Sequence, residues 1–198
     1  MDNYAVQAGF AKQRFLTYDQ EALIRKFRLS HDESYLYFTM LGLPYRLNRL
    51  TGDFEKKQSG WVDGNSFGEV MTALDILCDS REDRFPTGRW KPLQNFGKMF
   101  HSKLVEQEQD PLAPLFQNDP EGMKKQCVRL GGIPMPGGDI GMSFELMDGL
   151  RIGFQFWFED EDFPAAIRWF LDENADRYLR YETMYYAVGM LRARLTEK

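Results

Sequence analysis

Two stretches near the start of the chain show the period-two alternation of apolar and polar residues that is typical of a half-buried β-strand. The alternation runs over residues 33–50, and Gly42 divides it into a pair of strands. Residues 51–53, Thr-Gly-Asp, have turn chemistry because glycine tolerates positive φ. We therefore predict that residues 54–57 fold back as the third strand of an antiparallel meander.

A second group of strands is predicted in the C-terminal half of the chain. The dipeptide Asp148-Gly149 is a strong hairpin-turn sequence, and the segment before it places Met142, Phe144 and Leu146 on one face. The segment after it, 150–158, alternates perfectly, so that one face carries Leu150, Ile152, Phe154, Phe156 and Phe158. Residues 167–171 form a further strand or a short helix, and a short strand is predicted around Trp90. Together these strands require an apolar core on one side.

Helical spacing of apolar residues appears in four places, which we predict as helices over about 19–29, 66–79 and 121–130 and from about 180 to the end. Ser66 precedes an acidic first turn, which is the usual composition of a capped helix start. Helices and antiparallel hairpins without a βαβ rhythm predict an α+β fold. We expect residues 1–198 to form a single domain in which a meander sheet and hairpins pack with several helices, the last being a long amphipathic one.

Composition narrows the class of protein. The 198 residues are 43% hydrophobic and 28% charged, which is ordinary for a globular fold and unlike a disordered chain. The net charge of −5 argues against nucleic acid as a partner, because binding phosphates requires a basic face. No uncharged run of about 18 residues occurs, so no transmembrane helix is expected. The first residues show no secretory signal either, and we expect a cytoplasmic protein.

The most basic segment of the chain, 81–103, is the first candidate binding site. It interleaves cations with aromatic residues, and we select Arg84, Arg89, Trp90 and Lys91 as candidate ligand-binding residues. Guanidinium groups form paired hydrogen bonds with carboxylates and phosphates, and an aromatic face can hold a planar group. The alternative is a solvated loop whose charges balance the acidic segments elsewhere.

Acidic residues supply the second candidate. Residues 159–162, Glu-Asp-Glu-Asp, are the densest acidic cluster, with Asp160 and Asp162 as candidate metal ligands and Asp139 as a third. The spacing of a calcium-binding loop is absent, and an exposed acidic tip is the alternative. No nucleophile motif surrounds the two histidines, and Cys78 on an apolar helical face is expected to be an inert thiol. No cofactor is indicated, since two cysteines cannot hold a zinc ion or a cluster by themselves.

The last third of the chain resembles a bacterial family, domain of unknown function 3786. The resemblance is clearest over residues 150–195 and is carried by four segments: Phe156–Pro164, Phe170–Ala175, Tyr178–Thr183 and Tyr185–Gly189. It implies a bacterial cytosolic domain, related to members from anaerobic bacteria of which some carry an appended iron–sulfur-type cysteine cluster. Such a cluster is not implied here, because the chain has only Cys78 and Cys127. The resemblance supplies no activity and no catalytic residues.

Three hypotheses on function follow. The first is a non-catalytic binding module whose aromatic-lined cleft holds a small anionic or planar ligand, or a protein partner. The second is an enzyme that uses carboxylates, assisted by a metal ion at Asp160 and Asp162. The third is a scaffold subunit of a larger complex, which would show an extended exposed apolar patch. The sequence leaves the oligomeric state open.

Overall fold

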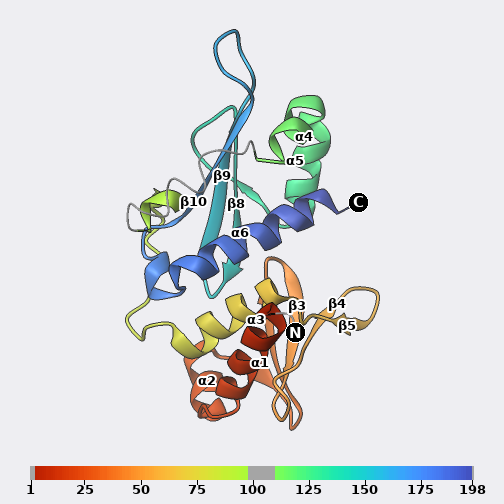
Figure 1. Cartoon of the computed structure of the whole chain (residues 1–198), viewed down its shortest axis with the longest axis vertical. Coiled ribbons are helices and arrows are strands. Elements are labelled where there is room, and N and C mark those ends of the chain that lie inside the picture. The colour runs from red at the N-terminus through yellow and green to blue at the C-terminus, as the bar shows by residue number, and fades with distance from the viewer. Residues whose placement is uncertain (1–2, 98–109, 198) are drawn as a thin grey trace.

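The computed structural model describes residues 3–97 and 110–197. Its N-terminal sheet is the predicted meander extended by one strand at each edge, in the order β1-β2-β3-β4-β5, with every neighbouring pair antiparallel. The strands are β1 (Ser30–His31), β2 (Tyr35–Met40), β3 (Leu43–Asn48), β4 (Phe54–Lys57) and β5 (Trp61–Asp63). In Figure 1 this sheet occupies the lower half of the molecule.

The C-terminal sheet is also antiparallel and has the order β6-β10-β9-β8-β7. Its strands are β6 (Trp90–Pro92), β7 (Ile133–Pro134), β8 (Ile140–Met147), β9 (Leu150–Trp157) and β10 (Ala166–Asp172). The predicted turn between β8 and β9 is confirmed, because Asp148 and Gly149 both have positive φ, 53° and 78°. Segment 167–171, for which a strand or a short helix was predicted, lies within β10 and is a strand. The prediction for Phe158 is wrong, since the residue lies beyond the end of β9 and is 37% exposed.

The helices are α1 (Asn3–Phe15), α2 (Gln20–Phe27), α3 (Phe67–Leu74), α4 (Ala113–Asn118), α5 (Pro120–Arg129) and α6 (Tyr181–Thr196). Helix α2 is capped by Asp19, which accepts a hydrogen bond from the Ala22 amide, and α3 by Ser66, as predicted. The predicted helix that ends near Asp79 is confirmed in extent but not in form. After α3 the chain continues as one π-helical turn, Asp75–Asp79, which we call the π-turn. No element was predicted over α1, because only Ala8 and Phe15 of this helix are buried and they make no clear amphipathic stripe.

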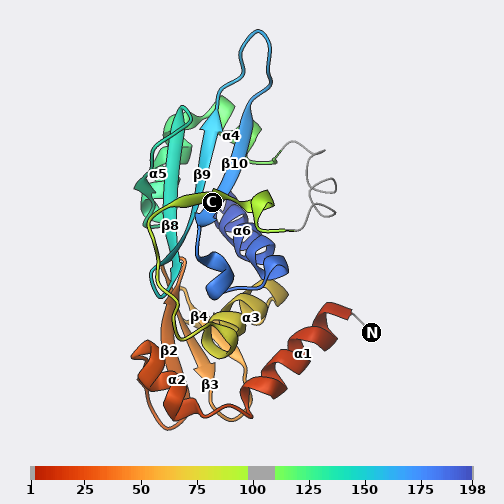
Figure 2. The same cartoon turned by 90° about the vertical axis from the view of Figure 1, so that its left-hand side faces the viewer.

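The two sheets are joined by helix packing, by a backbone hydrogen bond from the Leu41 amide to the Leu146 carbonyl oxygen at 2.9 Å, and by a buried arginine side chain. Figures 1 and 2 show α6 crossing the middle of the molecule, where it packs on α3, and α3 packs on α1. The buried apolar residues of both halves form one continuous cluster. Arg194 of α6 is buried and donates to the carbonyl oxygens of Met40 and Leu41, at 2.8 and 2.7 Å, and to the Tyr45 hydroxyl. The C-terminal helix is thereby tied to the turn between β2 and β3. Within the described ranges, no helix is both long enough and apolar enough to cross a membrane.

Candidate functional site

The structure places the predicted basic residues in separate surroundings. The Arg84 guanidinium donates to Asp148 at 2.7 Å and lies over the Phe27 ring, 4.3 Å from its centroid. The Arg89 guanidinium is bound to the Glu173 carboxylate at the start of the turn after β10. Both cations therefore already have a carboxylate partner.

Trp90 and Lys91 are successive residues of β6, so their side chains leave opposite faces of the C-terminal sheet. A Cβ atom at Gly153 would lie 3.1 Å from Cζ3 of Trp90, which shows that the indole covers this glycine. Lys91 instead places its ammonium 4.4 Å from the centre of the Phe96 ring. Of the remaining cations of the basic segment, Arg81 pairs with Asp83 at 2.9 Å, and Lys98 and Lys103 lie outside the described residues. A ligand site at 84–91 stays a prediction.

In and beside the acidic loop between β9 and β10, carboxylates accept hydrogen bonds from backbone amides. One Asp160 oxygen accepts hydrogen bonds from the amides of Asp162 and Phe163, and Asp139 accepts from the amide of Phe158 at 2.8 Å. Among residues 3–97 and 110–197, no group of three or more His, Cys, Asp or Glu side chains is arranged to hold a metal ion. A metal site at Asp160 and Asp162 thus has only the sequence pattern in its favour.

A surface groove lies elsewhere, between α2 and the π-turn. It has a volume of about 480 Å³ and is lined by Tyr18, Asp19, Ala22, Leu23, Arg25, Lys26, Cys78 and Glu82. This volume is within the range of small-molecule sites, roughly 300–1,000 Å³. The Lys26 ammonium donates to the Ser80 carbonyl oxygen at 2.6 Å and pairs with Glu82 at 2.9 Å. Lys26 is only 12% exposed, whereas Glu82 is 84% exposed.

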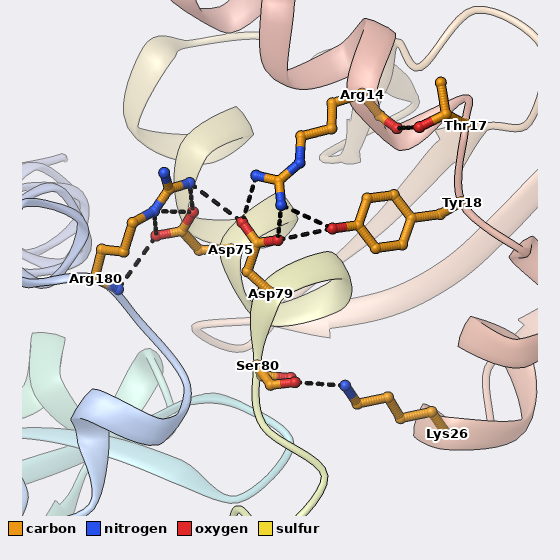
Figure 3. A network of polar contacts seen from close by, with 8 residues as sticks. All are labelled: Arg14, Thr17, Tyr18, Lys26, Asp75, Asp79, Ser80 and Arg180. Atoms are coloured by element: carbon orange, nitrogen blue, oxygen red, sulfur yellow. Dashed lines mark hydrogen bonds and ion pairs between the residues drawn. The ribbon is translucent and has the colours of Figure 1, made fainter.

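A polar network adjoins the groove at Tyr18, which lines it, and is drawn in Figure 3. Asp79 accepts two hydrogen bonds from Arg14, at 2.8 and 2.5 Å, and one from the Tyr18 hydroxyl at 2.8 Å. One Arg14 nitrogen also donates to Tyr18, at 2.9 Å. Arg180, which precedes α6, lies 3.3 Å from Asp79 and makes several hydrogen bonds to Asp75. Residues far apart in the sequence therefore meet on the π-turn.

The local sequence explains why the π-turn can hold this network. Asp75 and Asp79 are four residues apart in an otherwise apolar helical segment, so both carboxylates reach the same side of the turn. Asp75 is almost fully buried, which requires donors, and Arg180 and Thr183 supply them. Single π-turns within helices are frequent at functional sites. These residues were not among the candidate site residues predicted from the sequence. The pattern that identifies them is a pair of aspartates inside an apolar helix.

Of the titratable groups at the groove, Tyr18 and Cys78 are held in their neutral forms, whereas the neighbouring Arg14 is held in its charged form. Burial and the hydrogen bond to Asp79 raise the pKa of Tyr18, so its hydroxyl remains a donor at neutral pH. Burial raises the pKa of the Cys78 thiol to about 12, with Asp79 adding to the effect. Partial burial lowers the pKa of Arg14, but Asp79 and Tyr18 outweigh it and the net shift is upward. The site therefore offers fixed hydrogen-bond donors and cations, and its thiol is inert, as predicted.

The raised thiol pKa predicts slow alkylation of Cys78 in the native protein. The thiolate is the reactive form, and at pH 8 a thiol with a pKa of about 12 is ionised to only about one part in ten thousand. We expect iodoacetamide at pH 8 to label Cys78 at least about a hundredfold more slowly in the folded than in the urea-unfolded chain, measured by mass spectrometry. Because the folded-state pKa exceeds the unfolded one, this group also lowers stability as pH rises above about 8.5. Rapid labelling of the folded protein at pH 8 would contradict the assignment.

Together these features define an α+β domain with two antiparallel sheets and, in its N-terminal half, a groove of small-molecule size. The family described as domain of unknown function (DUF3786) matches residues 19–194, and the chain belongs to this family. The resemblance, clearest over residues 150–195, is therefore confirmed, and the match also spans both sheets and the groove residues from Asp19 onward. No curated protein and no solved structure matches the chain.

Proposed function

We propose that the domain is a non-catalytic binding module that takes up a small anionic ligand with a planar part in the groove between α2 and the π-turn. The observation that carries this proposal is the state of Lys26. Its ammonium is largely buried at the groove, and its one carboxylate partner, Glu82, is almost fully exposed.

The groove lining carries two cations, Lys26 and Arg25, and two carboxylates, Asp19 and Glu82, of which Lys26 is the best buried. Glu82 is exposed, and such surface pairs contribute little stability, so a ligand carboxylate or phosphate can replace it at Lys26 at small cost. Arg25 adds a second cation, since its closest carboxylate oxygen, on Asp19, lies 3.9 Å away and both side chains are exposed. A cationic ligand would be repelled by these two cations.

The other lining residues suit a planar group. Tyr18 contributes an aromatic ring, and Ala22 and Leu23 contribute an apolar surface beside it. The protonated states of Tyr18 and Cys78 support binding in preference to catalysis, because neither side chain is activated as a base or a nucleophile at neutral pH.

The test is calorimetric titration with inorganic phosphate, benzoate, adenosine monophosphate and flavin mononucleotide. For any anion that binds, we expect Lys26→Gln to weaken the affinity roughly tenfold or more, because a charge-assisted hydrogen bond is lost. Lys124→Gln is the matched control. Lys124 is an exposed lysine on α5 that also pairs with a carboxylate, Glu121, at 2.9 Å.

Two outcomes would count against the groove. If none of the four anions binds, the proposal of an anion-binding module fails for these ligand classes. If an anion binds equally well to Lys26→Gln but more weakly to Arg89→Gln, the ligand site is the basic segment 84–91.

A further inference from the structure

A continuous series of hydrogen bonds leads from the groove to the first turn of α6. Tyr18 lines the groove and donates to Asp79. Asp79 contacts Arg180, and Arg180 binds Asp75 through both its side chain and its backbone amide. Asp75 also accepts from the Thr183 hydroxyl, within the first turn of α6 (Figure 3 shows the part from Tyr18 to Arg180).

Arg180 itself does not line the groove. It lines a separate small cavity of about 20 Å³ behind the groove, together with Arg14, Asp75 and Asp79. Cys78 borders both spaces. The cavity has room for about one water molecule, so the Arg180 side chain can shift without displacing packed apolar side chains.

Asp79 is the shared element, since Tyr18, Arg14 and Arg180 all bind its carboxylate. The three contacts are unequal. Arg14 and Tyr18 approach to 2.8 Å or less, whereas Arg180 remains at 3.3 Å. A carboxylate that loses one donor attracts its remaining donors more strongly, because its charge is less well compensated, and the Asp79 side chain is 23% exposed.

We infer that filling the groove tightens the attachment of α6 to the N-terminal half through Tyr18, Asp79 and Arg180. An anionic ligand that accepts a hydrogen bond from the Tyr18 hydroxyl takes this donor away from Asp79. Asp79 then attracts the Arg180 guanidinium more strongly. Because Arg180 directly precedes α6, the first turn of α6 is held more tightly to the π-turn. The ligand in this inference rests on the proposed function, whereas the coupling between Tyr18 and Arg180 is a property of the protein alone and can be tested without a ligand.

The ligand-free test is a double-mutant cycle in urea unfolding with Tyr18→Phe and Arg180→Gln. Removing the Tyr18 hydroxyl makes Asp79 more dependent on Arg180. We therefore expect Arg180→Gln to reduce the folding equilibrium constant more in the Tyr18→Phe background than in the wild type, by a further factor of roughly three or more. A smaller difference, or one of opposite sign, overturns the coupling.

Tyr37→Phe is the matched control for this cycle. The Tyr37 hydroxyl also donates to an aspartate, Asp32 at 2.6 Å, in the same half of the molecule, but within the described residues no hydrogen bond joins that pair to Arg180. Its combination with Arg180→Gln should be additive within about twofold. If Tyr37→Phe shows the same non-additivity, the effect is a general loss of stability and the inferred route is wrong.

The ligand-dependent test is hydrogen exchange of the Met184 amide, which donates to the Arg180 carbonyl oxygen at 3.1 Å. With adenosine monophosphate at a saturating concentration, we expect exchange at Met184 to slow at least about threefold in the wild type and not in Tyr18→Phe. If the nucleotide binds and exchange is unchanged, the inference fails while the proposed function stands. If the nucleotide does not bind, the proposed function fails for this probe and the double-mutant cycle alone decides the coupling.

Discussion

Replacement of Arg194 by methionine is expected to lower the free energy of unfolding by about 3–5 kcal/mol, the largest effect among the predictions. The guanidinium is buried and bonds to two carbonyl oxygens in the turn between β2 and β3 and to the Tyr45 hydroxyl. Methionine keeps much of the volume but leaves these acceptors without donors. The Tyr45 hydroxyl, which loses the hydrogen bond from Arg194, also donates to the buried carboxylate of Glu69 at 2.6 Å.

Urea unfolding measured by circular dichroism tests this prediction. The matched control is Arg129→Met, because Arg129 is exposed on α5 and its guanidinium donates within the same helix, to Gln126 Oε1, 2.9 Å away. We expect the control to change stability by about 0.5 kcal/mol or less. A loss below about 1 kcal/mol for Arg194→Met would show that α6 is held to the N-terminal sheet by apolar packing and not by this arginine.

The second large effect is expected for Asp75→Asn, about 2–3 kcal/mol of unfolding free energy. Asp75 is 2% exposed and accepts from the Arg180 side chain, the Arg180 amide and the Thr183 hydroxyl. Asparagine removes the charge and presents an NH₂ group to donors that need an acceptor. The cost stays below that of a fully buried ion pair because Arg180 is 55% exposed and can regain water.

Thermal and urea unfolding of Asp75→Asn should be compared with Asp162→Asn in the exposed loop between β9 and β10. The loop variant is expected to be neutral within about 0.5 kcal/mol. If Asp75→Asn is equally neutral, the network on the π-turn does not hold α6, and the coupling inferred for the groove loses its structural basis.

The regular parts of the fold were predictable because their sequence patterns are local. The strands on either side of Asp148-Gly149 alternate with a period of two, and the turn residues themselves accept the positive φ that the hairpin requires. Asp19 and Ser66 cap helices for a similarly local reason, since each accepts a hydrogen bond from an amide three residues along the chain. Helix α1 escaped prediction because it buries too few residues to leave a periodic pattern.

The candidate site was not predictable in the same way. The basic and aromatic residues of segment 84–91 predicted a ligand site there, but folding alone determines which cations acquire carboxylate partners. Arg84 finds Asp148, which lies 64 positions away, and Arg89 finds Glu173. Lys26 was not selected, and it became a candidate only because α2 packs beside the π-turn and closes a groove around it.

The sequence by itself determined the α+β class, the two sets of hairpins, most of the helices and the family to which the chain belongs. Period, turn chemistry and caps depend on neighbouring residues, so a single chain displays them directly. The groove and its network were decided only by the tertiary structure. Arg14 and Tyr18, Asp79, and Arg180 come from three separate parts of the chain. They interact only because packing brings them within hydrogen-bond distance and removes most of the water around Asp75.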